Sequence, residues 1–279
     1  MSKNSRHILS NWPYIFWFAF YFFLSVLIFG ASIDSLKVVA VIYAVSLVAA
    51  FLPVTEAVVR FFSGVRSLKT SHEKERLIPI FDEVYEKARQ TNPHIFKGIR
   101  LYINNSMDVN AFAFGKKTLV ITRGATELLS DDCLYGIMAH EFGHFSNFDT
   151  MVLLVSTVGN IIMSTILKLI LWIVNLLHRY AKARYDSNII KIIYSLIAFI
   201  YSAIVFIGDV ILMSVSRKHE YLADEFAYRS GYGDELIGVL TELDAIMMSE
   251  PKGVMDILRR THPSLPCRIA KLEAYAESA

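Results

Sequence analysis

The sequence predicts a mostly helical α+β membrane protein with two transmembrane hairpins and a small β-sheet. Hydrophobic residues make up 54% of the 279-residue chain and charged residues only 19%, a balance that favours membrane spans over an ordinary soluble domain. The apolar residues are concentrated in four long stretches that form two pairs. Between the pairs, short alternating runs are typical of strands.

The first hairpin is expected over residues 1–62. Residues 12–33 form an almost unbroken apolar stretch, and its length suits a bilayer span. After a tight polar connection the chain is apolar again over residues 36–62, with a kink expected at Pro53. A signal peptide cleaved near Ala31 is the alternative. The apolar core is longer than the roughly 7–15 residues of such a peptide, and a second span follows at once, so we favour an uncleaved anchor.

Basic residues predict the orientation of this hairpin. Lys3 and Arg6 precede it, and a basic cluster follows it: Arg60, Arg66, Lys69, Lys74 and Arg76. By the positive-inside rule, both ends lie in the cytoplasm. We therefore expect a multi-pass protein of the plasma (inner) membrane with its polar domain facing the cytoplasm. The net charge of +2 is too small to indicate a nucleic-acid partner.

Residues 63–150 have the pattern of a folded polar domain. Thr70 and Glu73 are spaced as a capping box, and apolar residues from Leu77 to Ala88 recur at helical spacing. Alternation over residues 99–103, 110–115 and 118–122 predicts three short strands. Cys133 and Cys267 lack the spacing of a metal site. A disulfide between them is the alternative, but we favour buried or unreactive thiols.

The second hairpin is expected over residues 151–216. Its two apolar stretches cover residues 151–178 and 189–216, and residues 179–186 connect them. That connection is basic, against the positive-inside tendency if both stretches span. A hairpin partly embedded in the polar domain, or packed beside it, is the alternative. Residues 217–279 are polar and helical again.

A metal-binding motif lies near the end of residues 63–150. Residues 140–144 read H-E-x-x-H, and Ser130 can cap the helix that carries them. Positions four apart share a helix face, so His140 and His144 can hold one Zn²⁺. Glu141 is then placed to take a proton from the attacking water. A surface helix with two stray histidines is the alternative interpretation.

The third ligand is expected just after the fourth apolar stretch. A catalytic zinc keeps three protein ligands and one open position. Glu220 and Asp224 are four apart on a predicted helix, so one carboxylate can bind zinc while the other orients a zinc-bound imidazole. His219 competes with Glu220, but helical neighbours point about 100° apart. Only Glu220 would place a polar partner, Asp224, on the same side, which favours Glu220.

These motifs together resemble the HtpX-type membrane zinc metalloproteases, which are gluzincins with a glutamate as third zinc ligand. The resemblance covers nearly the whole chain. It implies a zincin-like metalloprotease domain formed by residues 63–150 and 217–279, with one Zn²⁺ per subunit held by His140, His144 and Glu220. The related CAAX prenyl proteases have a seven-helix membrane barrel, and four apolar stretches favour the HtpX branch.

Two further elements match the same family. Asn110-Ala111-Phe112 resembles an edge strand that pairs with the substrate backbone, a mode that gives main-chain hydrogen bonds without strong sequence choice. The resemblance also implies that His262 helps stabilise the oxyanion and that Arg268 supports the zinc site. Asp224 is expected to support the zinc site as well.

The sequence therefore predicts a membrane-bound zinc endopeptidase whose partners are polypeptide substrates and the lipid bilayer. By resemblance, its substrates are misfolded or damaged membrane proteins cut on the cytoplasmic side, as part of quality control. A processing protease for one membrane-associated peptide or lipoprotein is an alternative. A non-catalytic membrane chaperone on the same fold is another.

Overall fold

The computed structural model describes residues 3–155, 217–247 and 263–277, together with scattered positions between 165 and 199. The chain divides into two compact units. One contains residues Met1–Ser10, Leu52–Leu154 and Val215–Ala279, and the other contains Asn11–Phe51 and Val155–Ser214. Most of the expected second hairpin, residues 151–216, lies outside the described residues, and so does His262.

The first two helices form a helical hairpin. Helix α1 covers Lys3–Ile28 and α2 covers Ile33–Phe51. The Tyr43 ring of α2 packs edge-on against Phe18 and Phe22 of α1, and its hydroxyl lies 3.4 Å from Ser25 Oγ. Among the described helices, α2 is the one long and apolar enough to cross a membrane, with a mean hydropathy of 1.9. Helix α1 contributes a shorter apolar segment, Ile15–Leu27.

The second apolar stretch of this hairpin is divided rather than kinked. Helix α2 ends at Phe51, and a separate helix, α3, covers Pro53–Phe62. Leu52 between them is extended, with φ −74° and ψ 138°. Helical backbone dihedral angles are unfavourable for a residue that precedes proline, whereas proline itself is favourable in the first turn of a helix. Pro53 therefore ends one helix and begins the next.

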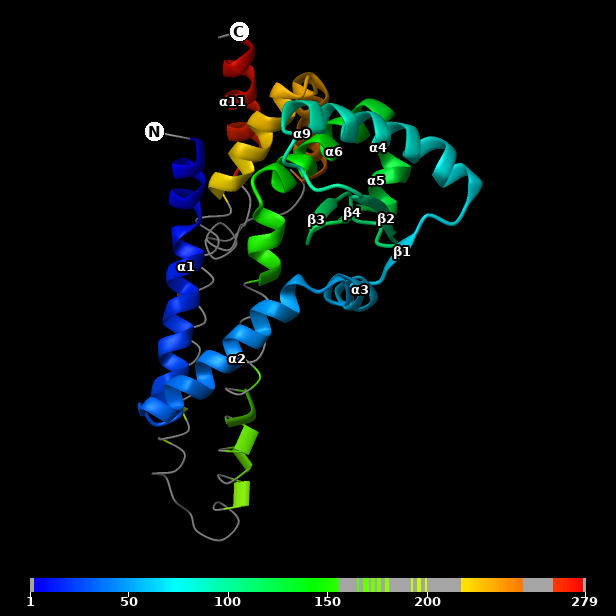
Figure 1. Cartoon of the computed structure of the whole chain (residues 1–279). Helices are drawn as coiled ribbons and strands as arrows, with labels where there is room; N and C mark the ends of the chain where they lie inside the picture. Colours follow the sequence, from blue (N-terminus) through cyan, green and yellow to red (C-terminus); the bar gives the residue numbers. More distant parts are fainter. Residues whose placement is uncertain are drawn as a thin grey trace. The chain divides into compact units, whose positions relative to one another are not determined.

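A four-stranded mixed sheet forms the centre of the polar unit (Figure 1). Its strands are β1 (Val65–Ser67), β2 (Arg100–Asn104), β3 (Ala111–Phe114) and β4 (Thr118–Thr122). They are ordered β1-β2-β4-β3, with β2 parallel to β4 and the other two pairs antiparallel. The three expected strands are present, and β3 lies at an edge. Strand β1 was not expected, because three residues are too few to show alternation.

Helices cover one face of the sheet and enclose the main core. They are α4 (Ser71–Thr91), α5 (Arg123–Leu128) and α6 (Asp131–Ser146). Thr70 and Glu73 form the expected capping box at the start of α4. The buried face of α4 meets inward side chains of β2 and β4 and the rings of Phe142 and Phe145 on α6. The amphipathic pattern of α4 is thus confirmed.

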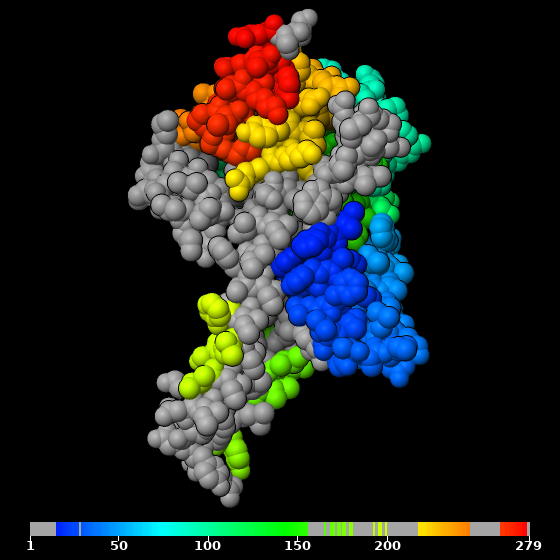
Figure 2. Space-filling view, turned by 90° about the vertical axis from the view of Figure 1, so that its left-hand side faces the viewer, coloured from blue at the N-terminus to red at the C-terminus, as the bar shows by residue number. Residues whose placement is uncertain are grey.

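The carboxy-terminal helices pack closely against α6. Residues 217–229 are helical, and α9 (Gly233–Met247) and α11 (Leu265–Glu277) follow. A Cβ added to Gly143 of α6 would lie 2.6 Å from the Cα of Ala223, so only glycine permits this approach. Figure 2 shows α11 against residues 217–247. This packing brings side chains of residues 217–247 and of α11 close to those of α6.

Candidate active site

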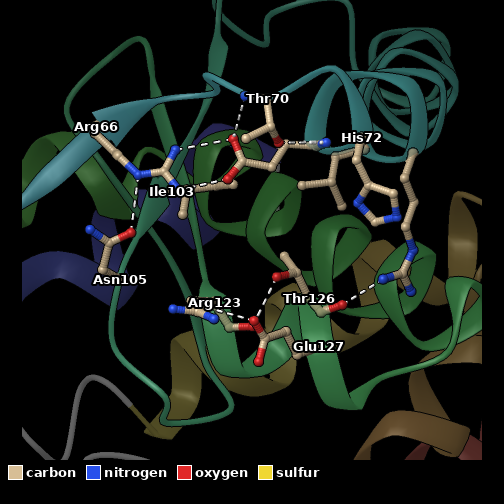
Figure 3. Close-up of a pocket in the computed structure, with 11 residues that line it drawn as sticks. Arg66, Thr70, His72, Ile103, Asn105, Arg123, Thr126 and Glu127 are labelled. Atoms are coloured by element: carbon tan, nitrogen blue, oxygen red, sulfur yellow. Dashed lines mark hydrogen bonds and ion pairs between the residues drawn. The ribbon is translucent and has the colours of Figure 1, made fainter.

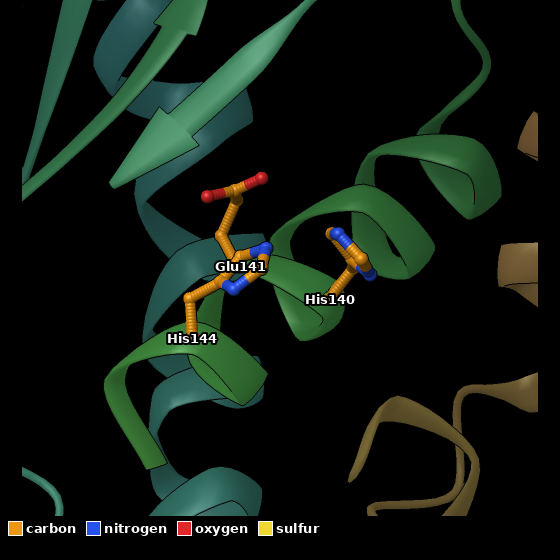
Figure 4. Close-up of side chains that lie close together, drawn as sticks. All are labelled: His140, Glu141 and His144. Carbon is orange, nitrogen blue, oxygen red and sulfur yellow. The ribbon is translucent and has the colours of Figure 1, made fainter. Parts of the chain in front are cut away.

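Helix α6 presents the two histidines and Glu141 as one cluster (Figure 4). Ser130 caps the helix by accepting a hydrogen bond from the backbone N–H of Cys133 at 3.3 Å. The ring centroids of His140 and His144 lie 4.9 Å apart. A ligand atom from each histidine and from Glu141 lies within 4.8 Å of the others. This is a group that can hold a metal ion.

Glu220 approaches both imidazoles from the helix through residues 217–229. Its Oε2 lies 3.4 Å from His140 Nε2, and its Oε1 lies 3.5 Å from His144 Nε2. Two ligands bound about 2.0–2.1 Å from one tetrahedral zinc lie about 3.4 Å apart. The Glu220 carboxylate therefore lies from each imidazole nitrogen at the spacing that two ligands of one tetrahedral ion require, and Glu220 is 2% exposed.

Asp224 and Arg268 both lie at the Nδ1 side of the His140 ring. Arg268 donates two hydrogen bonds to Asp224, at 2.6 and 2.8 Å, and its Nη1 lies 3.3 Å from Glu220 Oε2. Asp224 Oδ1 lies 2.9 Å from His140 Nδ1, closer than Arg268 Nη2 at 3.2 Å. A carboxylate accepts and a guanidinium only donates. We therefore assign the proton of His140 to Nδ1, which leaves the Nε2 lone pair directed at the cluster.

Asp149 contacts the Nδ1 atom of His144, as Asp224 contacts the Nδ1 atom of His140. Its Oδ2 lies 3.0 Å from His144 Nδ1, and its Oδ1 lies 3.0 Å from His219 Nδ1. Phe148, which follows the helix, has φ 63°, an uncommon conformation for a residue with a side chain. The reversal at Phe148 turns Asp149 back toward α6. His219 thus contacts Asp149 while its neighbour Glu220 faces the two imidazoles.

The cluster carries an excess of buried negative charge. Its one permanent cation is Arg268, against four carboxylates of the described residues: Glu141, Asp149, Glu220 and Asp224. Buried charge is costly unless it is compensated. With both imidazoles neutral, the excess is about three charges, and a divalent cation between the imidazoles and Glu220 would remove most of it. The donor set and the charge balance therefore both fit a divalent metal.

The carboxylates also affect the two imidazoles directly. Burial lowers the pKa of His140, and so does the charge of Arg268, but hydrogen bonds to Asp224 and Glu220 outweigh them and the net pKa is raised. Burial likewise opposes protonation of His144, yet Asp149 and Glu220 raise its pKa well above the ordinary value. Both rings thus lie in an environment that attracts positive charge.

The predicted substrate strand lies beside this cluster. Strand β3 begins at Ala111, pairs with β4 on one side and packs next to α6. Asn110 precedes it, and its backbone N–H donates to Thr122 Oγ1 at 3.0 Å. Phe112 is half-buried. The edge position expected for residues 110–112 is therefore observed.

A separate cavity of about 320 Å³ lies between β1, the start of α4 and α5 (Figure 3). The arginines that line it are each paired with a neighbouring side chain. Arg66 donates to Glu73 and Asn105, Arg123 donates to Glu127, and Arg76 binds Asp131 outside the lining. Hydrogen bonds from Arg66 and from the backbone N–H groups of Lys69 and Thr70 lower the pKa of Glu73 to about 2. These contacts fix the start of α4 against the sheet.

The family model for Peptidase family M48 matches residues 71–276. The chain belongs to peptidase family M48. It is 27% identical over 222 residues to a protein named Protease HtpX homolog from Bacillus licheniformis, covering 73% of this chain and 71% of that one. The protein of the same name from Bacillus subtilis is 27% identical over 269 residues, covering 87% and 86% of the two chains.

The fold is also similar to a solved structure of Ste24p from S. mikatae. The TM-score is 0.54 at 18% identity, over 90% of this chain. The match spans 61% of the length of the Ste24p chain. At this low identity the likeness concerns the fold alone. Family membership and the HtpX relatives identify this M48 chain as an HtpX-like membrane metalloprotease.

Proposed function

We propose that this M48 protein is a zinc endopeptidase of the gluzincin type. One Zn²⁺ per subunit is held by His140, His144 and Glu220. The observation that carries the proposal is the approach of the Glu220 carboxylate to both imidazoles, at 3.4 and 3.5 Å. Imidazole and carboxylate are ligands that catalytic zinc takes in a set of three, with one position left open.

Glu141 performs the proton transfers. When bound, the zinc ion supplies the Lewis acidity that polarises a peptide carbonyl and lowers the pKa of water. Glu141 lies one residue after His140 and shares the buried cluster. It takes a proton from the attacking water and later delivers a proton to the leaving amine nitrogen. By family resemblance, His262 donates a hydrogen bond to the oxyanion of the tetrahedral intermediate.

The surrounding carboxylates hold the ligands in place. Asp224 accepts from His140 Nδ1 and Asp149 accepts from His144 Nδ1, which fixes each ring with its Nε2 toward the Glu220 carboxylate. Arg268 neutralises Asp224 and contacts Glu220. These three residues position the ligands and do not touch the reacting atoms.

The substrate binds as an added strand along β3. The segment Asn110-Ala111-Phe112 lies at the edge of the sheet next to α6. An extended peptide can hydrogen-bond to such an edge through its main chain, which admits many sequences. Such tolerance suits a protease that acts on unfolded chains.

The proposed substrates are misfolded or damaged membrane proteins, cut on the cytoplasmic side in quality control. The HtpX relatives and the apolar helix α2 support a site held near the bilayer. A processing protease for one membrane-associated peptide or lipoprotein is the second candidate. A non-catalytic chaperone is the third candidate. It is disfavoured because Glu141 and the proposed ligands are all present.

The test compares Glu141→Gln with the wild-type protein. The variant should keep its zinc, because Glu141 is not a ligand, and lose at least about 10²-fold in turnover of an unfolded membrane substrate. Glu86→Gln, an exposed change on α4, is the matched control and should cleave normally. Near wild-type cleavage by Glu141→Gln would show that Glu141 does not perform the proton transfers. Membrane proteins trapped by Glu141→Gln in cells separate the candidates: many substrates indicate quality control, and one indicates processing.

A further inference from the structure

Helix α3 has two chemically opposite faces. One carries Glu56, which is 8% exposed, and the half-buried Arg60. The other is apolar and open to the surroundings, with Phe61 79% and Phe62 82% exposed. The exposed positions of α3 are Pro53, Val54, Ala57, Val58, Phe61 and Phe62. They recur at helical spacing, so they form one continuous stripe.

The polar face is fixed to the turn between β3 and β4. Glu56 accepts hydrogen bonds from the backbone N–H groups of Lys116 at 2.6 Å and Lys117 at 3.3 Å, and from Thr118 Oγ1 at 3.0 Å. A Cβ added to Gly115, whose φ is +65°, would overlap the Glu56 carboxyl group. The turn is therefore shaped to receive this side chain.

Arg60 adds a second attachment one helical turn later. It donates to Thr118 Oγ1 at 2.8 Å, and its guanidinium lies 4.9 Å from the centre of the Tyr102 ring on β2. Helix α3 thus lies on the opposite side of the sheet from α4 (Figure 1). Two anchored side chains prevent the helix from rotating, so the apolar stripe is held facing away from the sheet.

The chain itself indicates what covers this stripe. A single residue, Leu52, separates α3 from α2, the helix able to cross a membrane. With α2 crossing a bilayer, α3 would begin where α2 leaves it. Its ten residues extend only about 15 Å, too short to span. A short helix with one apolar face and one polar face suits the interfacial plane.

We propose that α3 is an interfacial helix that inserts its apolar stripe into the headgroup and acyl boundary of the lipid bilayer. Through Glu56 and Arg60 it holds the β3–β4 turn at a set height above the membrane. A second copy of this chain is a poorer occupant, because a stable protein interface buries about 1,200–2,000 Å². One face of a ten-residue helix offers on the order of a few hundred Å².

The test measures the depth of spin labels on the full-length protein in lipid nanodiscs. Labels are placed by Phe61→Cys or Phe62→Cys in a Cys267→Ser background, since Cys133 is buried and Cys267 is exposed. Leu128→Cys is the matched control, because Leu128 is an exposed apolar residue of the same unit, on α5. Collisions with oxygen report lipid, and collisions with a water-soluble nickel chelate report solvent.

Both α3 labels should favour oxygen over nickel, and the Leu128 label should show the reverse. Equal, nickel-dominated accessibility at all three positions would overturn the proposal. Dipolar coupling between α3 labels of different chains would also overturn it and assign the stripe to self-association. Val58→Cys gives an independent reading on the same face if one phenylalanine variant is poorly produced.

Discussion

Arg268 and Asp224 form a buried bidentate ion pair, with nitrogen-to-oxygen distances of 2.6 and 2.8 Å. The two residues are 44 positions apart in the sequence, and they join α11 to the helix through residues 217–229. Asp224 also holds His140, so the pair couples the position of the last helix to the proposed metal site. Removing one partner would leave the other charged and buried.

Arg268→Met should therefore destabilise the protein by about 3–5 kcal/mol. Arg268→Lys keeps the charge but cannot bind both oxygens, so its loss should be smaller. The double variant Asp224→Leu with Arg268→Met should recover part of the stability, because no buried charge remains unpaired. Unfolding in mild detergent measures all three. The single variant Asp224→Leu completes the cycle, and a double variant that loses the sum of the Asp224→Leu and Arg268→Met effects would show that the pair is not coupled.

Asp149→Asn should weaken zinc binding by about 10–100-fold, because the variant no longer holds the His144 ring as a carboxylate does. Competition with a chelator on the purified protein measures this affinity. Asp132→Asn, an exposed change in the first turn of α6, is the matched control and should bind as the wild type does. Equal affinities for the two variants would remove Asp149 from the site.

Glu73→Gln should destabilise the domain by about 1 kcal/mol near neutral pH, because Arg66 loses a charged partner at a partly exposed site. The pKa of Glu73 is lowered from 4.5 to about 2 in the folded protein. The stabilisation is therefore complete above about pH 4.5 and is lost as the pH falls toward 2. Unfolding midpoints of the two proteins should converge over that interval. A constant difference down to pH 2 would contradict this account.

Reporter fusions test the membrane topology that we propose. Fusions after Gly64 and at Ala279 should report the cytoplasm, and one at Ser35 should report the outside, because basic residues flank the first hairpin. A fusion at Lys182 tests the second hairpin. An external signal there is expected if both of its stretches span, and a cytoplasmic signal would mean that they do not.

Local sequence signals predicted much of the domain. The capping box at Thr70 and Glu73, the Ser130 cap and the strands around residues 99–122 all depend on neighbours within a few positions, and each is observed. Pro53 predicts a kink, whereas the helix is divided there. The sequence also does not show that Glu56 anchors the next helix to a turn 60 residues later.

The surroundings of the histidines were harder to predict. The spacing of Glu220 and Asp224 placed both on one helix face, as observed. The sequence leaves the role of Asp149 open, because its contact with His144 depends on the left-handed backbone at Phe148 and on the approach of His219. Periodicity carries no information on such reversals or on contacts between distant segments.

The most direct test of the account is the zinc content of two purified variants that change adjacent residues. Glu220→Ala removes the carboxylate that approaches both imidazoles, and His219→Ala removes a ring that contacts Asp149 instead. After dialysis against a modest chelator concentration, Glu220→Ala should have lost most of its zinc, and His219→Ala should retain it. A zinc-replete Glu220→Ala beside a zinc-depleted His219→Ala would contradict the gluzincin assignment.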